Sequence, residues 1–149
     1  MLECAELFRL NERMNMRLTL CCAVVCLFAL GARAAEPGSW AGEYTDKKFL
    51  NGSATFQLSI EQSGGKTQVS FDAVNNDGGG CAPEAQGMAT ASGKDKLTFN
   101  FRDNEGNAGT GTITRSGDDV VVSLKATKVA KQDCTKFYRD NIRLKRAKK

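Results

Sequence analysis

Apolar and polar residues alternate along the chain from about residue 40 onward. The clearest segment contains Phe56, Leu58 and Ile60, which share one face, while Thr55 and Gln57 occupy the other. Clusters of Gly, Asn, Asp and Ser interrupt the alternation at intervals of about 8–15 residues, which is typical of an antiparallel all-β domain. The pattern therefore predicts short strands joined by turns.

Eight segments show this period of two, at residues 40–44, 55–60, 69–73, 85–91, 97–101, 109–113, 120–124 and 142–146. Eight sequential strands with mostly short links close most economically into an antiparallel up-and-down barrel, because closure leaves no exposed sheet edge. A β-sandwich of two sheets is the alternative. A short helical or irregular connection is expected over residues 129–132, before the last strand.

Two loops contain residues that often bind ligands. Residues 75–80 read NNDGGG, but no G-K-[ST] and no helix signal follow, so we expect no phosphate cradle. We expect a flexible loop that a disulfide at Cys81 pins at one end. Residues 103–107 read DNEGN, which lacks the ligand spacing and the distal Glu of a calcium loop. The sequence therefore predicts a turn there.

Residues 16–35 have the pattern of a secretory signal peptide. Arg17 supplies the positive charge, residues 18–30 form a nearly unbroken apolar run of 13, and Ala32 and Ala34 are the small residues at a cleavage site after Ala34. A bilayer span needs about 20 apolar residues, so no stable membrane span is expected. We expect residues 1–34 to be an N-terminal extension plus signal peptide, with Met14 and Met16 as alternative starts.

Residues 35–149 are therefore expected to form a single β-barrel domain that is periplasmic or secreted. Cleavage would leave Cys81 and Cys134 as the two remaining cysteines, and in an exported domain such thiols usually pair. The 52 residues between them make loop closure worth ~4 kcal/mol on the chain-entropy estimate. A structural disulfide is expected, since the mature chain has no C-x-x-C to support a redox role.

Histidine is absent from the chain, which excludes Ser-His-Asp and Cys-His catalysis and His-ligated zinc. Two remaining cysteines cannot build a four-cysteine metal site. Nothing singles out a Ser/Lys dyad or a carboxylate pair, so we expect no enzyme, no catalytic residue, no metal and no cofactor.

Charge is unevenly distributed along the mature chain. Residues 35–124 contain 7 basic and 12 acidic residues, whereas residues 125–149 contain 10 basic and 2 acidic residues. The basic segment could favour an anionic partner, or it could be a solvated last strand with a lysine-rich end. No aromatic residue alternates with the final basic cluster, so nucleic-acid binding is not expected.

The start Gly38-Ser39-Trp40 and the basic Arg146 near the end resemble the calycin pattern of lipocalins and avidins. In that pattern a tryptophan on the first strand packs beneath a basic residue of the last strand. The resemblance implies a calycin-like barrel that Trp40 and Arg146 close at one end. The overall format, with a signal peptide, a small barrel, one disulfide and a basic end, is also similar to bacterial periplasmic inhibitors of c-type lysozyme.

These features predict a non-enzymatic exported module of the binding or inhibitor type, whose glycine-rich loops can carry recognition. Its partner would be an envelope protein or a cell-wall component. The alternative is a carrier for a small apolar ligand in a lipocalin-like barrel cavity. The small residues Gly87, Ala89, Ala91, Gly109 and Gly111 could leave room for such a ligand.

Overall fold

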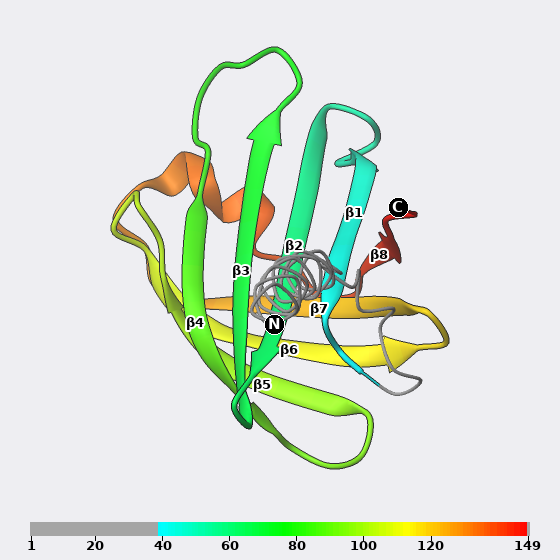
Figure 1. Ribbon diagram of the computed structural model, residues 1–149. Helices are drawn as coiled ribbons and strands as arrows, with labels where there is room; N and C mark the ends of the chain where they lie inside the picture. Colours follow the sequence, from blue (N-terminus) through cyan, green and yellow to red (C-terminus); the bar gives the residue numbers. More distant parts are fainter. Residues whose placement is uncertain (1–38, 149) are drawn as a thin grey trace, which may run out of the picture. The chain divides into compact units, whose positions relative to one another are not determined.

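Each strand pairs antiparallel with its neighbours in sequence, and the last strand pairs with the first. The computed structural model describes residues 39–148, so the predicted signal peptide lies outside the described residues. The closed barrel is built, in order, from β1 (Gly42–Phe49), β2 (Ala54–Ser63), β3 (Lys66–Asn75), β4 (Glu84–Ala91), β5 (Lys96–Arg102), β6 (Ala108–Ser116), β7 (Asp119–Lys128) and β8 (Ile142–Arg146). Figure 1 shows the strands in this order, from cyan β1 to red β8.

This architecture confirms the expected eight-stranded up-and-down barrel of the calycin-like type and excludes the sandwich. The period of two explains it, because successive side chains of a strand point to opposite faces. In β3, for example, Val69, Phe71 and Ala73 are buried, whereas Ser70 and Asp72 between them are only partly covered. Every strand therefore contributes one apolar row to a common interior.

Aromatic rings fill the interior. Phe71 stacks on Phe56 at 5.7 Å between ring centroids and meets the ring of Phe101 edge-on at 5.2 Å. Phe101 in turn lies 6.4 Å from Phe99. All four side chains are almost completely buried. These rings therefore form a continuous aromatic layer in the core.

Three of the five small residues that were expected to leave room for a ligand, Gly87, Gly109 and Gly111, lie against other atoms of the protein. A Cβ atom at Gly111 would lie 2.1 Å from Cζ of Phe99, and one at Gly109 would lie 2.7 Å from Cζ of Phe101. A Cβ atom at Gly87 in β4 would lie 2.2 Å from the carbonyl oxygen of Asn100. The space beside all three glycines is thus occupied by the protein's own atoms.

The two ends of the barrel differ. The Trp40 end consists of Trp40, Arg146 and the turns at residues 64–65, 92–95 and 117–118. The disulfide end consists of the β1–β2 turn (50–53), the β3–β4 loop (76–83), the β5–β6 loop (103–107) and the segment 129–141 with the 3₁₀-helix η1 (Gln132–Phe137). Figure 1 shows η1 (orange) and the β3–β4 loop (green) at the same end.

The expected helical or irregular connection at 129–132 is confirmed as an irregular segment, and η1 then extends it to Phe137. The extension has a packing cause, because η1 carries two residues that anchor it: Cys134 in the disulfide, and Phe137, which is fully buried and stacks on Phe49 at 6.3 Å. Among residues 39–148, no helix is long and apolar enough to cross a bilayer.

Candidate binding surface at the disulfide end

Cys81 and Cys134 form the expected disulfide, with 5.3 Å between their Cα atoms. Both residues are buried. The bond ties the end of the glycine-rich β3–β4 loop to η1 across a sequence separation of 53 residues. A carboxylate oxygen of Glu105 and the two sulfur atoms lie within 4.8 Å of one another. The sulfur atoms are bonded to each other, so this group does not offer two thiolates to a metal.

The carboxylate of Asp103 organises the β5–β6 loop. Its Oδ1 accepts the backbone N–H groups of Glu105 at 3.0 Å and Asn107 at 2.8 Å. Its Oδ2 accepts the side-chain amide of Asn107 at 3.0 Å and the hydroxyl of Tyr138. Asp103 is 5% exposed, and a carboxylate this deeply buried requires such donors. The expected turn over residues 103–107 is therefore confirmed.

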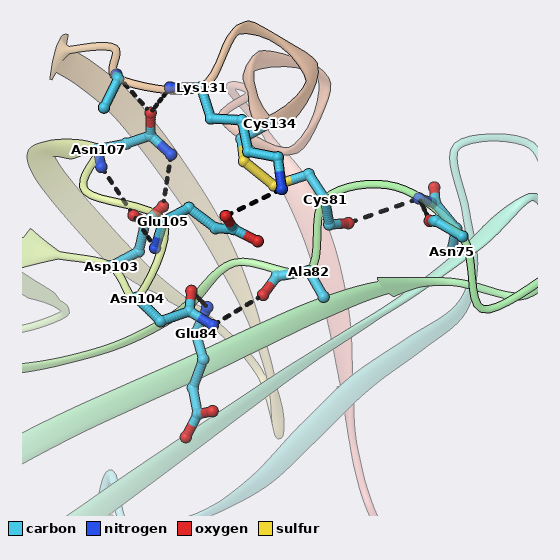
Figure 2. A network of polar contacts seen from close by, with 12 residues as sticks. Asn75, Cys81, Ala82, Glu84, Asp103, Asn104, Glu105, Asn107, Lys131 and Cys134 are labelled. Atoms are coloured by element: carbon cyan, nitrogen blue, oxygen red, sulfur yellow. Dashed lines mark hydrogen bonds and ion pairs between the residues drawn. A yellow bond between two sulfur atoms is a disulfide. The ribbon is translucent and has the colours of Figure 1, made fainter.

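Asn107 connects this loop to the segment that precedes β8. Its Oδ1 accepts the backbone N–H groups of Ala130 at 2.8 Å and Lys131 at 3.0 Å, and its Nδ2 donates to the hydroxyl of Tyr138 at 3.0 Å. Figure 2 shows the Asn107 amide between the loop and the chain at Lys131. Asn107 has no exposed surface, and all of its polar groups are bonded. The 129–131 backbone is thereby fixed to the barrel.

Further side chains fix the β3–β4 loop. The Asn104 side chain accepts the N–H of Glu84 at 2.9 Å and donates to the carbonyl of Ala82 at 3.2 Å. The Asn75 amide donates to the carbonyl of Gly79 at 2.5 Å. Lys136 of η1 donates to Oδ1 of Asn75 at 2.8 Å. Figure 2 shows the Asn104 contacts and the disulfide, which join the β3–β4 loop to the β5–β6 loop and to η1.

An ion pair also joins the β5–β6 loop to the segment before η1. Nζ of Lys131 lies 3.0 Å from a carboxylate oxygen of Glu105. The Lys131 side chain is 42% exposed, so the pair falls in the range of surface ion pairs, about 0–1 kcal/mol. The loops at this end are therefore held in one conformation. The disulfide at Cys81 pins one end of the 75–80 loop, and the contacts of Asn75 with Gly79 and Lys136 hold its other end.

The solvent-exposed surface of the disulfide end is polar and has one prominent apolar residue. Asp77, Gly78, Asn104 and Asp133 are exposed, and Val129, which precedes η1 in the same end, is 44% exposed. A rigid surface loses little conformational entropy when it binds, which is the main advantage of preorganisation. The arrangement can therefore present a fixed set of backbone and side-chain groups to a partner.

Sequence reasoning singled out the cysteines of this end but not Asn75, Asn104, Asn107 or Tyr138. The turn chemistry of residues 103–107 was visible, since Asp and Asn bond to nearby backbone groups in turns. The contact between Asn107 and Tyr138 spans 31 residues and has no local signature in the sequence.

The pKa of Tyr138 is raised above its ordinary value of 10.0, first by burial and then by the hydrogen bond to the Asp103 carboxylate. The folded protein keeps this proton at pH values where the unfolded chain has lost it. The contribution to stability is therefore complete below about pH 10 and is lost as the pH rises further. Tyr138 stays protonated at neutral pH and acts there as a structural donor.

We expect Tyr138→Phe to lower the free energy of unfolding by about 1–3 kcal/mol at neutral pH, because Asp103 loses a donor in a buried site. We also expect a weaker decline in stability between about pH 10 and about pH 12 than in the wild type. Urea denaturation across this range measures both effects. Tyr44 is present in both proteins and serves as the internal control; an identical pH dependence would contradict the assignment.

At the Trp40 end, the prediction that Arg146 packs over Trp40 is wrong. The guanidinium over the Trp40 indole belongs to Arg115 of β6, at 4.1 Å from the ring centroid. Arg115 also donates to the carbonyl of Ser39 at 3.3 Å. Arg146 instead lies over the ring of Tyr44 at 4.9 Å. The cause is register, because β1 and β8 pair Tyr44 with Arg146, four residues beyond Trp40.

Arg146 still joins the first and last strands. Its guanidinium donates to the carbonyl of Ala41 at 2.9 Å, to the hydroxyl of Tyr44 at 2.6 Å and to the carbonyl of Asp118 at 3.3 Å. Gly42 makes this possible, since a Cβ atom there would lie 2.6 Å from Nη1 of Arg146. Closure of this end therefore uses two arginine–aromatic pairs, Arg115 with Trp40 and Arg146 with Tyr44.

A double-mutant cycle distinguishes these pairs. We expect Trp40→Phe and Arg115→Met to be non-additive by at least ~0.5 kcal/mol, because the first weakens and the second removes the same cation–π contact. The cycle of Trp40→Phe with Arg146→Met is expected to give a smaller coupling. Thermal or urea unfolding of the six proteins provides the values; a larger coupling for the second cycle would restore the pairing predicted from the sequence.

Comparison of the chain with protein-family models, curated proteins and solved structures finds no match.

Proposed function

We propose that the protein is an exported, non-enzymatic binding module of the inhibitor type, which recognises an envelope protein through its disulfide end. The observation that carries this proposal is the filled barrel. Phe99 and Phe101 occupy the space beside Gly111 and Gly109, so a partner meets the outside of the barrel. A lipocalin-like carrier needs an interior pocket of roughly 300 Å³ or more, and this packing argues against it.

The disulfide end is the best-supported recognition surface on two grounds. Its loops are restrained by the disulfide and by the buried Asp103–Asn107–Tyr138 contacts. It also presents Val129, one of three large apolar residues that are exposed in the described chain. Apolar groups within a polar rim are typical of protein-binding surfaces.

The predicted export of the protein also supports a binding module of the inhibitor type. A disulfide persists in an oxidising compartment, and residues 16–35 have the pattern of a signal peptide. The format resembles the periplasmic inhibitors of c-type lysozyme, so a glycosidase of that class is the first partner to assay. Inhibition requires only that a rigid surface cover the enzyme's cleft, and it needs no catalytic group on this chain.

The test is capture of envelope proteins by the tagged protein purified from the periplasm, quantified by mass spectrometry. The paired change Val129→Asp with Asp133→Lys alters two exposed residues of the disulfide end. The matched control, Met88→Asp with Glu61→Lys, makes the same chemical changes on exposed strand positions elsewhere. We expect the first variant to lose a specific captured protein and the control to keep it. Equal capture by both variants would contradict the proposed surface.

A further inference from the structure

The outer surface of β5–β8 carries positive charge. Six basic side chains occupy exposed positions on these strands, and none of them forms an ion pair within residues 39–148: Lys96, Arg102, Lys125, Lys128, Arg143 and Lys145. In the described part of these strands, the one acidic residue at an outward position is Asp119, at the start of β7. It accepts the backbone N–H of Arg146 at 3.0 Å. We call this surface the basic face.

Hydroxyl groups lie between the charges of the basic face. The strand register aligns Lys96 with Thr114, Val121 and Arg143 in one row across β5 to β8. The next row contains Thr98, Thr112 and Ser123, and the row after it contains Asn100, Thr110 and Lys125. Neighbouring strands are about 4.8 Å apart, and rows two residues apart are about 6.8 Å apart. Cations and hydrogen-bonding groups therefore alternate on one surface.

The strands β1–β4 carry most of the acidic strand residues, together with the exposed Lys47, Lys48 and Lys66. Glu43, Glu61, Asp72 and Glu84 occupy outward positions of β1–β4. Asp72 pairs in register with Glu84. Burial and these like charges raise the pKa of Asp72. The outward positions of β5–β8 therefore carry a larger excess of basic residues than those of β1–β4, and such a surface attracts anionic partners.

The side chains of the basic face also limit the kind of anion. The outward positions of β5–β8 in the described chain carry no aromatic residue on which bases could stack. The large exposed apolar residues, Val74, Met88 and Val129, lie outside the basic face, so insertion into a membrane has no anchor there. Threonine and asparagine groups between lysines and arginines instead match a chain that alternates anionic groups with hydroxyls.

We propose that the basic face of β5–β8 binds an anionic polysaccharide of the cell envelope, with its carboxylate groups on Lys96, Lys125 and Arg143 and its hydroxyls on the threonines of β6. This inference shares the predicted export with the function proposed above, but it concerns a different surface and another class of ligand. Binding of this kind would retain the protein at the cell surface.

The probe is a set of alginate oligosaccharides, which are linear polyuronates, titrated into the full protein at low ionic strength. Neutral dextran and poly-glutamate are the comparators. We expect alginate to bind, dextran not to bind, and poly-glutamate to bind at least roughly fivefold more weakly, since it lacks ring hydroxyls. The triple variant Lys96→Gln, Lys125→Gln, Arg143→Gln should weaken alginate binding by roughly 10- to 100-fold and reduce its salt dependence.

The matched control is Lys47→Gln, Lys48→Gln, Lys66→Gln, which removes the same charge from exposed positions outside the basic face. It should change alginate affinity by less than about threefold. A second pair, Thr110→Val and Thr112→Val, should weaken binding to alginate but not to poly-glutamate. Thermal unfolding confirms that each variant is folded.

Three results would overturn the inference. The first is no alginate binding at low ionic strength. The second is an equal loss of binding in the two triple variants, which would make net charge the cause. The third is tighter binding to poly-glutamate or to duplex DNA than to alginate, which would assign the face to an acidic protein or to nucleic acid.

Discussion

Replacing both Cys81 and Cys134 with alanine is expected to lower the free energy of unfolding by ~4 kcal/mol. The bond spans a sequence separation of 53 residues, and its loss releases the loop-closure entropy of the unfolded chain. Net stabilities of domains this size are roughly 5–15 kcal/mol, so the change removes a large share of the total. Urea denaturation of the variant and the oxidised wild type measures the difference.

The reduced wild type is the control for this experiment, since it keeps both sulfur atoms and lacks only the bond. It should lie close to the double-alanine variant. We also expect faster amide hydrogen exchange in residues 76–83 and 132–137, the two segments that the disulfide joins. A loss below about 1 kcal/mol in both proteins would mean that the polar contacts of Figure 2 are sufficient to hold this end.

Phe99→Ala is expected to lower the free energy of unfolding by about 3–5 kcal/mol, the usual cost of removing a buried phenylalanine ring. The ring is 4% exposed and covers Gly111, so its loss leaves a cavity beside β6. Chemical denaturation gives the value. A loss below about 1 kcal/mol would show that the ring does not fill the barrel interior.

Enlarging Gly111 tests the same contact between Gly111 and the Phe99 ring. Gly111→Ala should cost about 1–3 kcal/mol in the wild type, because its Cβ would lie 2.1 Å from Cζ of Phe99. In the Phe99→Ala background the same change should be neutral or stabilising, since the ring is gone. An equal cost in both backgrounds would place the penalty in the backbone of β6.

The strand pattern alone was sufficient to predict the barrel. Alternation such as Phe56, Leu58 and Ile60 identifies one buried face for each strand, and eight such strands with short links favour closure. The disulfide could be predicted as well, because a signal peptide would remove four of the six cysteines. Both inferences rest on local pattern or on elimination, and neither needs knowledge of distant contacts.

The contacts at the two ends could not be predicted, because they depend on register. A shift of four residues decides whether Arg146 meets Trp40 or Tyr44, and no local signal sets it. The role of Gly111 depends on its cross-strand partner Phe99, which is twelve residues away. Tyr138 meets Asp103 only because η1 folds back across the barrel end. The partner of each of these residues is set by tertiary packing and not by the conformational propensity of the residue itself.

The central claim is that the barrel interior is closed to ligands and that recognition takes place on the outer surface. Native mass spectrometry of the protein purified from the periplasm without denaturation tests it most directly. The account predicts a single species with the mass of the polypeptide and one disulfide, and no bound small molecule. A stoichiometric apolar ligand that is released only on unfolding would contradict the account and restore the carrier hypothesis.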